Sequence, residues 1–166
     1  IRDSCYHCKN TLFRQILRAA ENDGFPVLLD GTNASDDAGD RPGMRALREL
    51  SVRSPLRECG LTKAEIRRLS REAGLFTWDK PAYACLATRI RTGEEITLQK
   101  LKQTEKAEGF LFGLGFRDFR VRMVDNTAKL ELREADLPLL LENREKIVTE
   151  LRKDYDSVLL NLEVRK

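Results

Sequence analysis

The sequence has few of the features that mark a membrane protein, a secreted protein or a general nucleic-acid-binding protein. Its longest apolar runs, "VLLD" and "LPLLL", fall far short of the ~20 residues that a membrane span needs. No signal-peptide pattern opens it. Thirty basic and 27 acidic residues leave a net charge of only +3. We therefore expect a cytoplasmic protein whose partner is neither a membrane nor a nucleic acid.

Histidine and tryptophan are the scarcest of the chemically useful residues, with one of each. His7 lies between two cysteines and is interpreted as a bystander rather than a general base. Two roles remain for Trp78: stacking on a base or ring of a ligand, or packing in a half-buried position. Hydrophobic residues make up 41% of the chain and charged residues 34%, which is typical of a globular protein with a core.

Four cysteines are present, and two of them form a CxxC pair in "SCYHCK". In a chain without secretory features, CxxC indicates metal or redox chemistry more often than a structural disulfide. Cys5 and Cys8 precede a predicted helix, whose free amides favour thiolates. With Cys85 they would form a three-thiolate site, which suits a 4Fe-4S cluster with one open iron position. Zinc with His7 or Cys59 as fourth ligand, and unrelated free thiols, remain alternatives. Cys59, between a predicted helix and Gly60, is otherwise expected to be a buried cysteine without a special role.

The first half of the chain alternates predicted helices and strands, which indicates an α/β layer with parallel pairing. Helices are predicted over 11–23, 42–50 and 62–73, and short strands over 27–29 and 51–54. A two-stranded parallel sheet cannot cover its own faces, so we expect further strands to complete it.

The second half has the order α-β-β-α-β, which is most of a ferredoxin-like α+β domain. The helix is predicted over 97–114, a hairpin over 119–133, a helix over 136–154 and a strand over 157–164. An irregular segment, 77–93, joins the halves and carries a cysteine and basic residues, as functional loops do. The expected domains are therefore 1–92 and 93–166.

Polar residues follow the first predicted strand in "LLDGTNASDD", where open α/β sheets bind ligands. Carboxylate and hydroxyl oxygens there could hold Mg²⁺ beside phosphates, although an ordinary Asx-rich turn would have the same composition. The candidate residues are Asp30, Gly31, Thr32, Asn33, Asp36 and Asp37, with Asp40 close by.

Four basic residues form the remaining candidate group: Lys80, Arg89, Arg120 and Arg122. Arg120 and Arg122 are two apart on a predicted strand, so both side chains leave the same face. Paired guanidinium groups suit carboxylate or phosphate ligands. The alternative is a solvated strand face on which the arginines pair with Glu131 or Glu134.

Several strings, in this order, resemble the LarE-type sulfur transferases, a family of PP-loop ATP pyrophosphatases that act in nickel-pincer nucleotide synthesis. They are "CYHCK", "DGTNASDD", "RPGMRAL", "VRSPL", "GLTKAEIRRLS", "TWDKPAYACLATRI", "GEEIT" and "FRVR". The combination of "GLTKAEIR" with "KPAYACLATRI" is specific, whereas "DGTN" also occurs in other PP-loop enzymes.

The resemblance implies an enzyme that uses ATP and Mg²⁺ to adenylate a carboxylate of pyridinium-3,5-biscarboxylic acid mononucleotide and then delivers sulfur to it. Cys85, Arg89 and Glu108 would be catalytic, and Lys80, Thr88, Arg120 and Arg122 would bind this nucleotide substrate. The sulfur donor is either a sacrificial Cys85 or sulfide on a cluster held by the three cysteines. Family members assemble as multimers, so a homo-oligomer is expected.

The Ser-Gly-Gly-x-Asp-Ser motif that cradles ATP phosphates in this family is absent from the sequence. In the family it precedes the segment seen here, so we expect the chain to be a C-terminal fragment that does not hydrolyse ATP by itself. A tRNA-thiolating PP-loop enzyme and a non-enzymatic zinc-binding module are the alternative functions.

Overall fold

The computed structural model describes residues 4–36 and 42–165 and divides into two compact units, Ile1–Lys80 (unit 1) and Pro81–Lys166 (unit 2), each described here by itself. The division comes before the Cys85 segment, whereas the sequence placed the boundary at residue 92. That segment is bound to unit 2 by arginine side chains, described below. Within the described ranges, no helix is both long enough and apolar enough to cross a membrane.

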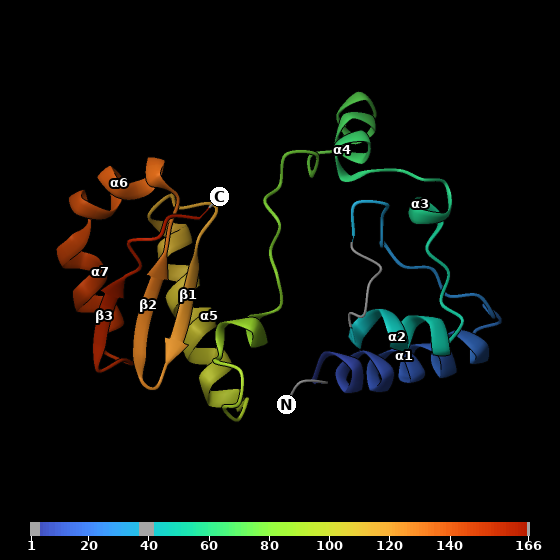
Figure 1. Cartoon of the computed structure of the whole chain (residues 1–166), viewed down its shortest axis with the longest axis horizontal. Helices are drawn as coiled ribbons and strands as arrows, with labels where there is room; N and C mark the ends of the chain where they lie inside the picture. The colour runs from blue at the N-terminus through green and yellow to red at the C-terminus, as the bar shows by residue number, and fades with distance from the viewer. Residues whose placement is uncertain (1–3, 37–41, 166) are drawn as a thin grey trace. The chain divides into compact units, whose positions relative to one another are not determined.

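Unit 1 consists mainly of helices: α1 (Ser4–Asn22), α2 (Pro42–Glu49), α3 (Pro55–Glu58) and α4 (Lys63–Glu72). α1 and α2 pack against each other (Figure 1). Gly43 allows their close approach, because a Cβ there would lie 3.1 Å from Cδ of Lys9. α1 starts before the CxxC pair, so the prediction that both thiols precede the helix was wrong.

A capping box is present at the start of α4. The Thr62 hydroxyl accepts a hydrogen bond from the Glu65 amide, and the Glu65 carboxylate accepts one from the Thr62 amide. Two backbone donors that the first helical turn leaves unpaired are thereby satisfied.

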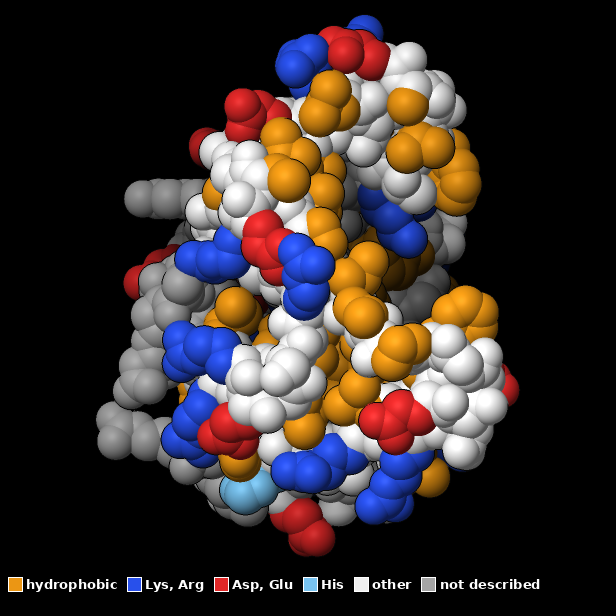
Figure 2. Space-filling model, turned by 90° about the vertical axis from the view of Figure 1, so that its right-hand side faces the viewer, with side chains coloured by type: hydrophobic (Ala, Val, Ile, Leu, Met, Phe, Trp, Pro, Cys, Tyr) orange, Lys and Arg blue, Asp and Glu red, His pale blue; other side chains and the backbone are white. Residues whose placement is uncertain are grey.

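The two predicted strands of unit 1 are reduced to one parallel bridge, between Leu29 and Arg53. Only two backbone hydrogen bonds join the segments, Asp30 N to Arg53 O at 2.9 Å and Arg53 N to Leu28 O at 3.0 Å. Phe25, Val27 and Leu29 are 69%, 57% and 59% exposed, because no neighbouring strand covers them in the described structure. Figure 2 shows hydrophobic side chains at the surface beside lysines and arginines. The predicted parallel direction is present, but the described part of unit 1 has no parallel sheet.

Unit 2 follows the predicted order, with its second helix divided near Asn143. Its elements are η1 (Leu86–Arg89), α5 (Leu98–Gly113), β1 (Arg120–Val124), β2 (Thr127–Glu131), η2 (Glu134–Asp136), α6 (Leu137–Glu142), α7 (Arg144–Leu151) and β3 (Ser157–Leu160). The sheet order is β1-β2-β3, antiparallel between β1 and β2 and parallel between β2 and β3. This is a mixed α/β unit with a small sheet, and the ferredoxin-like arrangement stays a prediction.

The hydrophobic core cluster lies in unit 2, where α5 packs against β1 and α7 against β3 (Figure 1). Phe119 and Val121 point into this core, as their alternation with the arginines of β1 predicts. The buried face of α5 has helical spacing and consists of Thr104, Ala107, Glu108 and Leu111. A carboxylate therefore occupies a core position, and its partner identifies the candidate site.

Candidate functional site

Cys85 begins a short structured loop in unit 2. It is the residue before η1, and its side chain is exposed. Its carbonyl accepts two hydrogen bonds from Thr88, one from the amide at 2.9 Å and one from the hydroxyl at 2.7 Å. The exposed thiol therefore belongs to a residue whose carbonyl is held by Thr88, three residues further along the chain.

Arg89 and Glu108 form a buried ion pair beneath this loop, and both side chains are almost fully buried. Arg89 Nε donates to Glu108 Oε1 at 2.6 Å and Nη2 donates to Oε2 at 3.0 Å, a bidentate geometry. Glu108 Oε1 also accepts the Val121 amide of β1 at 3.0 Å. The pair joins η1, α5 and β1, and it brings two of the three predicted catalytic residues into contact.

Arg120 and Arg122 also contact the backbone of the Cys85 segment. Arg120 Nη2 donates to the Ala82 carbonyl at 3.1 Å, and Arg122 Nη1 donates to the Thr88 carbonyl at 2.7 Å. Arg122 Nε donates to Glu131 at 2.7 Å, which is the pairing foreseen as the alternative to anion binding. Together with Arg89, these two arginines hold both ends of the loop that carries Cys85.

Arg120 differs from the other two arginines in its charge balance. It is 9% exposed, and among the described residues no carboxylate lies within ion-pairing distance of it. Burial, followed by the neighbouring charges of Arg89 and Arg165, lowers the pKa of Arg120. The Glu108 and Asp118 carboxylates offset these effects only in part. A bound anion would stabilise the cation further, so Arg120 is the predicted substrate-binding arginine with the clearest electrostatic reason to bind one.

Tyr83 is a site residue that the sequence reasoning did not select. Its ring packs near Phe112, at 5.8 Å between centroids, and the Arg89 guanidinium lies 5.4 Å from the ring centroid. Burial, together with the neighbouring Glu108 carboxylate, raises the pKa of Tyr83 to about 12. The phenol therefore stays neutral at physiological pH. The only sequence signal was its place two residues before the cysteine in "AYAC".

Unit 1 contains a second candidate site, a cavity of about 540 Å³ at the start of α1 and α2. The cavity brings together four residues of the predicted nucleotide loop and one thiol of the CxxC pair. Its lining residues are Cys5, Lys9, Asp30, Gly31, Thr32, Asp36, Pro42, Gly43 and Met44. Lys9, which the sequence reasoning did not select, adds a cation to this lining.

Hydrogen bonds within the loop fix the Asp30 carboxylate. Ser54 Oγ donates to Asp30 Oδ1 and Thr32 Oγ1 donates to Oδ2, both at 2.6 Å. Burial alone would raise the pKa of Asp30, but these bonds, with the Lys9 charge, lower it below its ordinary value. Asp36 accepts the Asn33 amide at 3.0 Å. The loop thus has Asx-turn bonding, and it presents a fixed carboxylate to the cavity.

The thiol residues belong to different units, Cys5 and Cys8 to unit 1 and Cys85 to unit 2. Cys5 and Cys8 are exposed and lie three residues apart on α1, so they share a face of the helix. Within the described ranges, no three histidine, cysteine or acidic side chains form a group that could hold a metal. The three-cysteine ligand set and its cluster stay a prediction.

The remaining predicted residues make other contacts within their own unit or lie outside the described ranges. Asp37 and Asp40 are among the residues that the structure does not describe. Lys80 belongs to unit 1, where its carbonyl accepts a hydrogen bond from Arg67 at 2.7 Å. The Arg71 guanidinium lies over the Trp78 ring, with its central carbon 4.9 Å from the ring centroid. Cys59 is exposed rather than buried, so that expectation was wrong.

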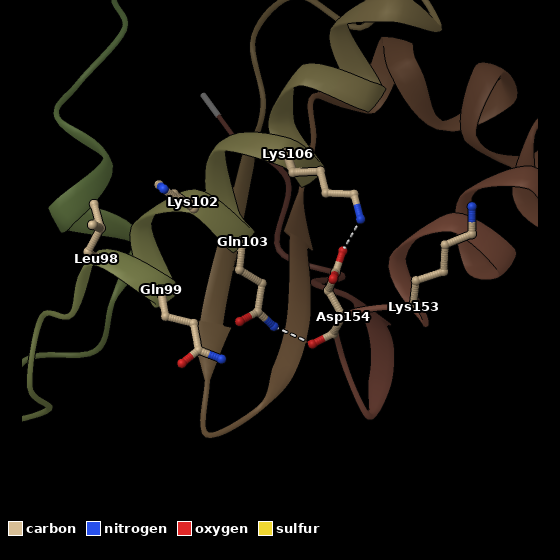
Figure 3. Close-up of a pocket in the computed structure, with 7 residues that line it drawn as sticks. All are labelled: Leu98, Gln99, Lys102, Gln103, Lys106, Lys153 and Asp154. Atoms are coloured by element: carbon tan, nitrogen blue, oxygen red, sulfur yellow. Dashed lines mark hydrogen bonds and ion pairs between the residues drawn. The ribbon is translucent and has the colours of Figure 1, made fainter.

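A groove of about 630 Å³ in unit 2 is larger than the cavity of unit 1 (Figure 3). It lies between α5 and the turn after α7, and its lining includes Lys102, Lys106 and Lys153. Lys106 pairs with Asp154 at 2.6 Å, and Lys153 pairs with Glu150. Because two of its three cations are paired and no predicted site residue lines it, the groove is a weaker candidate.

Comparison with known proteins gives three relatives and no matching protein-family profile. An uncharacterized protein of Synechocystis is 42% identical over 77% of this chain, and one of Methanocaldococcus jannaschii is 33% identical over 99%. The pyridinium-3,5-bisthiocarboxylic acid mononucleotide synthase of Lactiplantibacillus plantarum is 35% identical over 133 residues, 80% of this chain.

The chain spans only 48% of the synthase and of the Synechocystis protein, and 64% of the archaeal one. The similarity thus covers most of this chain and about half of the Lactiplantibacillus synthase.

Proposed function

We propose that this chain is the sulfur-delivering part of an ATP-dependent sulfur transferase that acts on an adenylated carboxylate of pyridinium-3,5-biscarboxylic acid mononucleotide. The observation that carries the proposal is the exposed Cys85 thiol, on a loop held by three arginines. The similarity to the bisthiocarboxylic acid synthase, whose name specifies a thiolated product, supports the same chemistry.

Two sulfur donors are consistent with the cysteines present. In the first, the Cys85 thiolate attacks the acyl adenylate, and AMP leaves as a thioester forms. Loss of the Cys85 Cα proton then breaks the Cβ–S bond, which releases a thiocarboxylate and leaves dehydroalanine. In the second, Cys5, Cys8 and Cys85 would hold a 4Fe-4S cluster, which would supply sulfide at its open iron.

The charged residues have separate roles in this proposal. Arg120, buried with no ion-paired carboxylate among the residues that the structure describes, would attract the anionic substrate, and Arg89 would keep the loop in place through its pair with Glu108. In unit 1, Asp30 and Asp36 line the cavity where ATP and Mg²⁺ would bind. Assembly into a homo-oligomer is also part of the proposal.

The test supplies the substrate as its preformed acyl adenylate, so that sulfur delivery does not depend on ATP hydrolysis by the chain. The expected product is the thiocarboxylate, released together with AMP and identified by mass spectrometry. Release of the ordinary carboxylate alone, at the rate of hydrolysis in buffer, would refute the proposal.

The mass of the protein after the reaction identifies the donor. Loss of one hydrogen sulfide equivalent indicates the sacrificial cysteine. An unchanged mass, in protein reconstituted anaerobically to about four irons per chain, indicates the cluster. In the cluster design, Cys85→Ala must lower the iron content.

A further inference from the structure

We infer that Thr88 is a positioning residue rather than a residue that contacts the substrate. Its hydroxyl links the buried Arg89–Glu108 pair to the Cys85 carbonyl by hydrogen bonds. The inference rests on the proposed function for its role in sulfur delivery. The hydrogen-bonded arrangement itself can be tested without that function.

The direction of the hydrogen bonds follows from the chemistry of the groups. Arg89 Nη1 lies 2.9 Å from Thr88 Oγ1, which lies 2.7 Å from the Cys85 carbonyl oxygen. A guanidinium group has donors only, so the Thr88 hydroxyl must accept from Arg89. Its single proton is then free for the Cys85 carbonyl. The series runs in one direction, from the buried ion pair through Thr88 to Cys85.

The carbonyl of Thr88 is held as well. Arg122 Nη1 donates to it at 2.7 Å, and Arg122 is itself oriented by its ion pair with Glu131 on β2. Thr88 is therefore attached to the core through its hydroxyl and to the sheet through its backbone. Its hydroxyl proton and one acceptor position are already used, which leaves less capacity for a substrate contact.

This attachment explains why an exposed residue needs a hydroxyl group. Thr88 and Cys85 are both exposed, but Arg89 beneath them is 1% exposed and has a fixed geometry. Each added hydrogen bond restricts the loop to fewer conformations before the substrate arrives. A thiol held in this way reaches an acyl carbon in one orientation, which lowers the entropic cost of the attack.

The test compares Thr88→Val, which removes the hydroxyl and keeps the shape, with Thr88→Ser, which keeps the hydroxyl. Amide hydrogen exchange reports on the loop at two positions. One is the amide of residue 88, which donates to the Cys85 carbonyl, and the other is the amide of Ile90, which donates to the Ala87 carbonyl. Loss of one net hydrogen bond predicts about fivefold faster exchange in Thr88→Val, with Thr88→Ser within about twofold of wild type. The Val121 amide should be unchanged, which shows that the core is intact.

Thr127→Val is the matched control, because Thr127 bonds Ser157 in the sheet and should leave the loop amides unchanged. Unaltered exchange in Thr88→Val, or equally fast exchange in Thr88→Ser, would overturn the inference. With the acyl adenylate, Thr88→Val should lower the rate constant of transfer and leave KM unchanged. A raised KM with an unchanged rate constant would assign Thr88 to substrate binding instead. If wild type transfers no sulfur, the proposed function fails, and hydrogen exchange still decides the attachment of Thr88.

Discussion

Replacing Glu108 by glutamine should destabilise unit 2 far more than removing a charge from its surface. The side chains of Arg89 and Glu108 are 0% and 1% exposed and share two hydrogen bonds. Glu108→Gln keeps the shape of the side chain but leaves the Arg89 cation buried without a counter-charge. Breaking a buried pair in this way costs about 3–5 kcal/mol. Because glutamine retains one acceptor oxygen, we expect about 3 kcal/mol, a factor of roughly 150 in the unfolding equilibrium constant.

Urea unfolding followed by far-UV circular dichroism gives the free energy of unfolding, and Trp78 fluorescence follows unit 1 separately. The matched control is Lys106→Gln on the same helix, whose partner is Asp154. That pair is 52% and 35% exposed, so its loss should cost far less stability than the loss of the buried pair. Both variants remove one charge from α5, so the difference between their losses of stability measures the effect of burial.

A double-mutant cycle isolates the interaction itself. Arg89→Met combined with Glu108→Leu removes both charges, and we expect it to recover much of the stability lost in either single variant. A cost below about 1 kcal/mol for Glu108→Gln, or additive losses in the double variant, would refute the view that this pair anchors the Cys85 loop.

Three further predictions concern single groups. Ser54→Ala should raise the pKa of Asp30 toward its ordinary value in an NMR titration, because it removes one of the hydrogen bonds to the carboxylate. In wild type, the stability that the lowered pKa of Asp30 provides is complete above about pH 4 and is lost as the pH falls. Tyr83 should keep its proton to about pH 12, and Glu108→Gln should lower that pKa, which the ultraviolet absorbance difference from Tyr83→Phe measures. Thr62→Ala should cost about 1 kcal/mol by removing the capping box of α4, and Thr62→Ser should restore stability in the same urea assay. An unchanged value in any of the three would contradict the corresponding contact.

The local patterns of the second half were strong enough to predict its elements from the sequence. The alternation of β1 and β2 and the helical spacing of the buried face of α5 each depend on neighbouring residues only. The first half was harder to predict because a parallel strand needs partners from distant parts of the chain. Val27 to Leu29 has the composition of a buried strand, yet in the described structure it pairs only at Leu29.

The candidate site shows the same limit. Cys85, Arg89, Arg120 and Arg122 could be selected from the sequence by residue type. In the structure, the arginines contact the Cys85 loop within unit 2. That Glu108 faces Arg89 could not be read from spacing, because 19 residues separate the two. Nor could the sequence show that Arg122 would be paired with Glu131, while Arg120 would be buried with no carboxylate of the described residues within ion-pairing distance. These outcomes depend on how α5 packs against β1.

The most direct test of the account is the amount of thiocarboxylate formed per chain by Cys85→Ser, with Cys59→Ser as the matched exposed-cysteine control. The substrate is the preformed acyl adenylate. We predict that Cys59→Ser forms as much thiocarboxylate as wild type and that Cys85→Ser forms none. Thiocarboxylate formation by Cys85→Ser at the wild-type level would contradict the assignment of this loop to sulfur delivery.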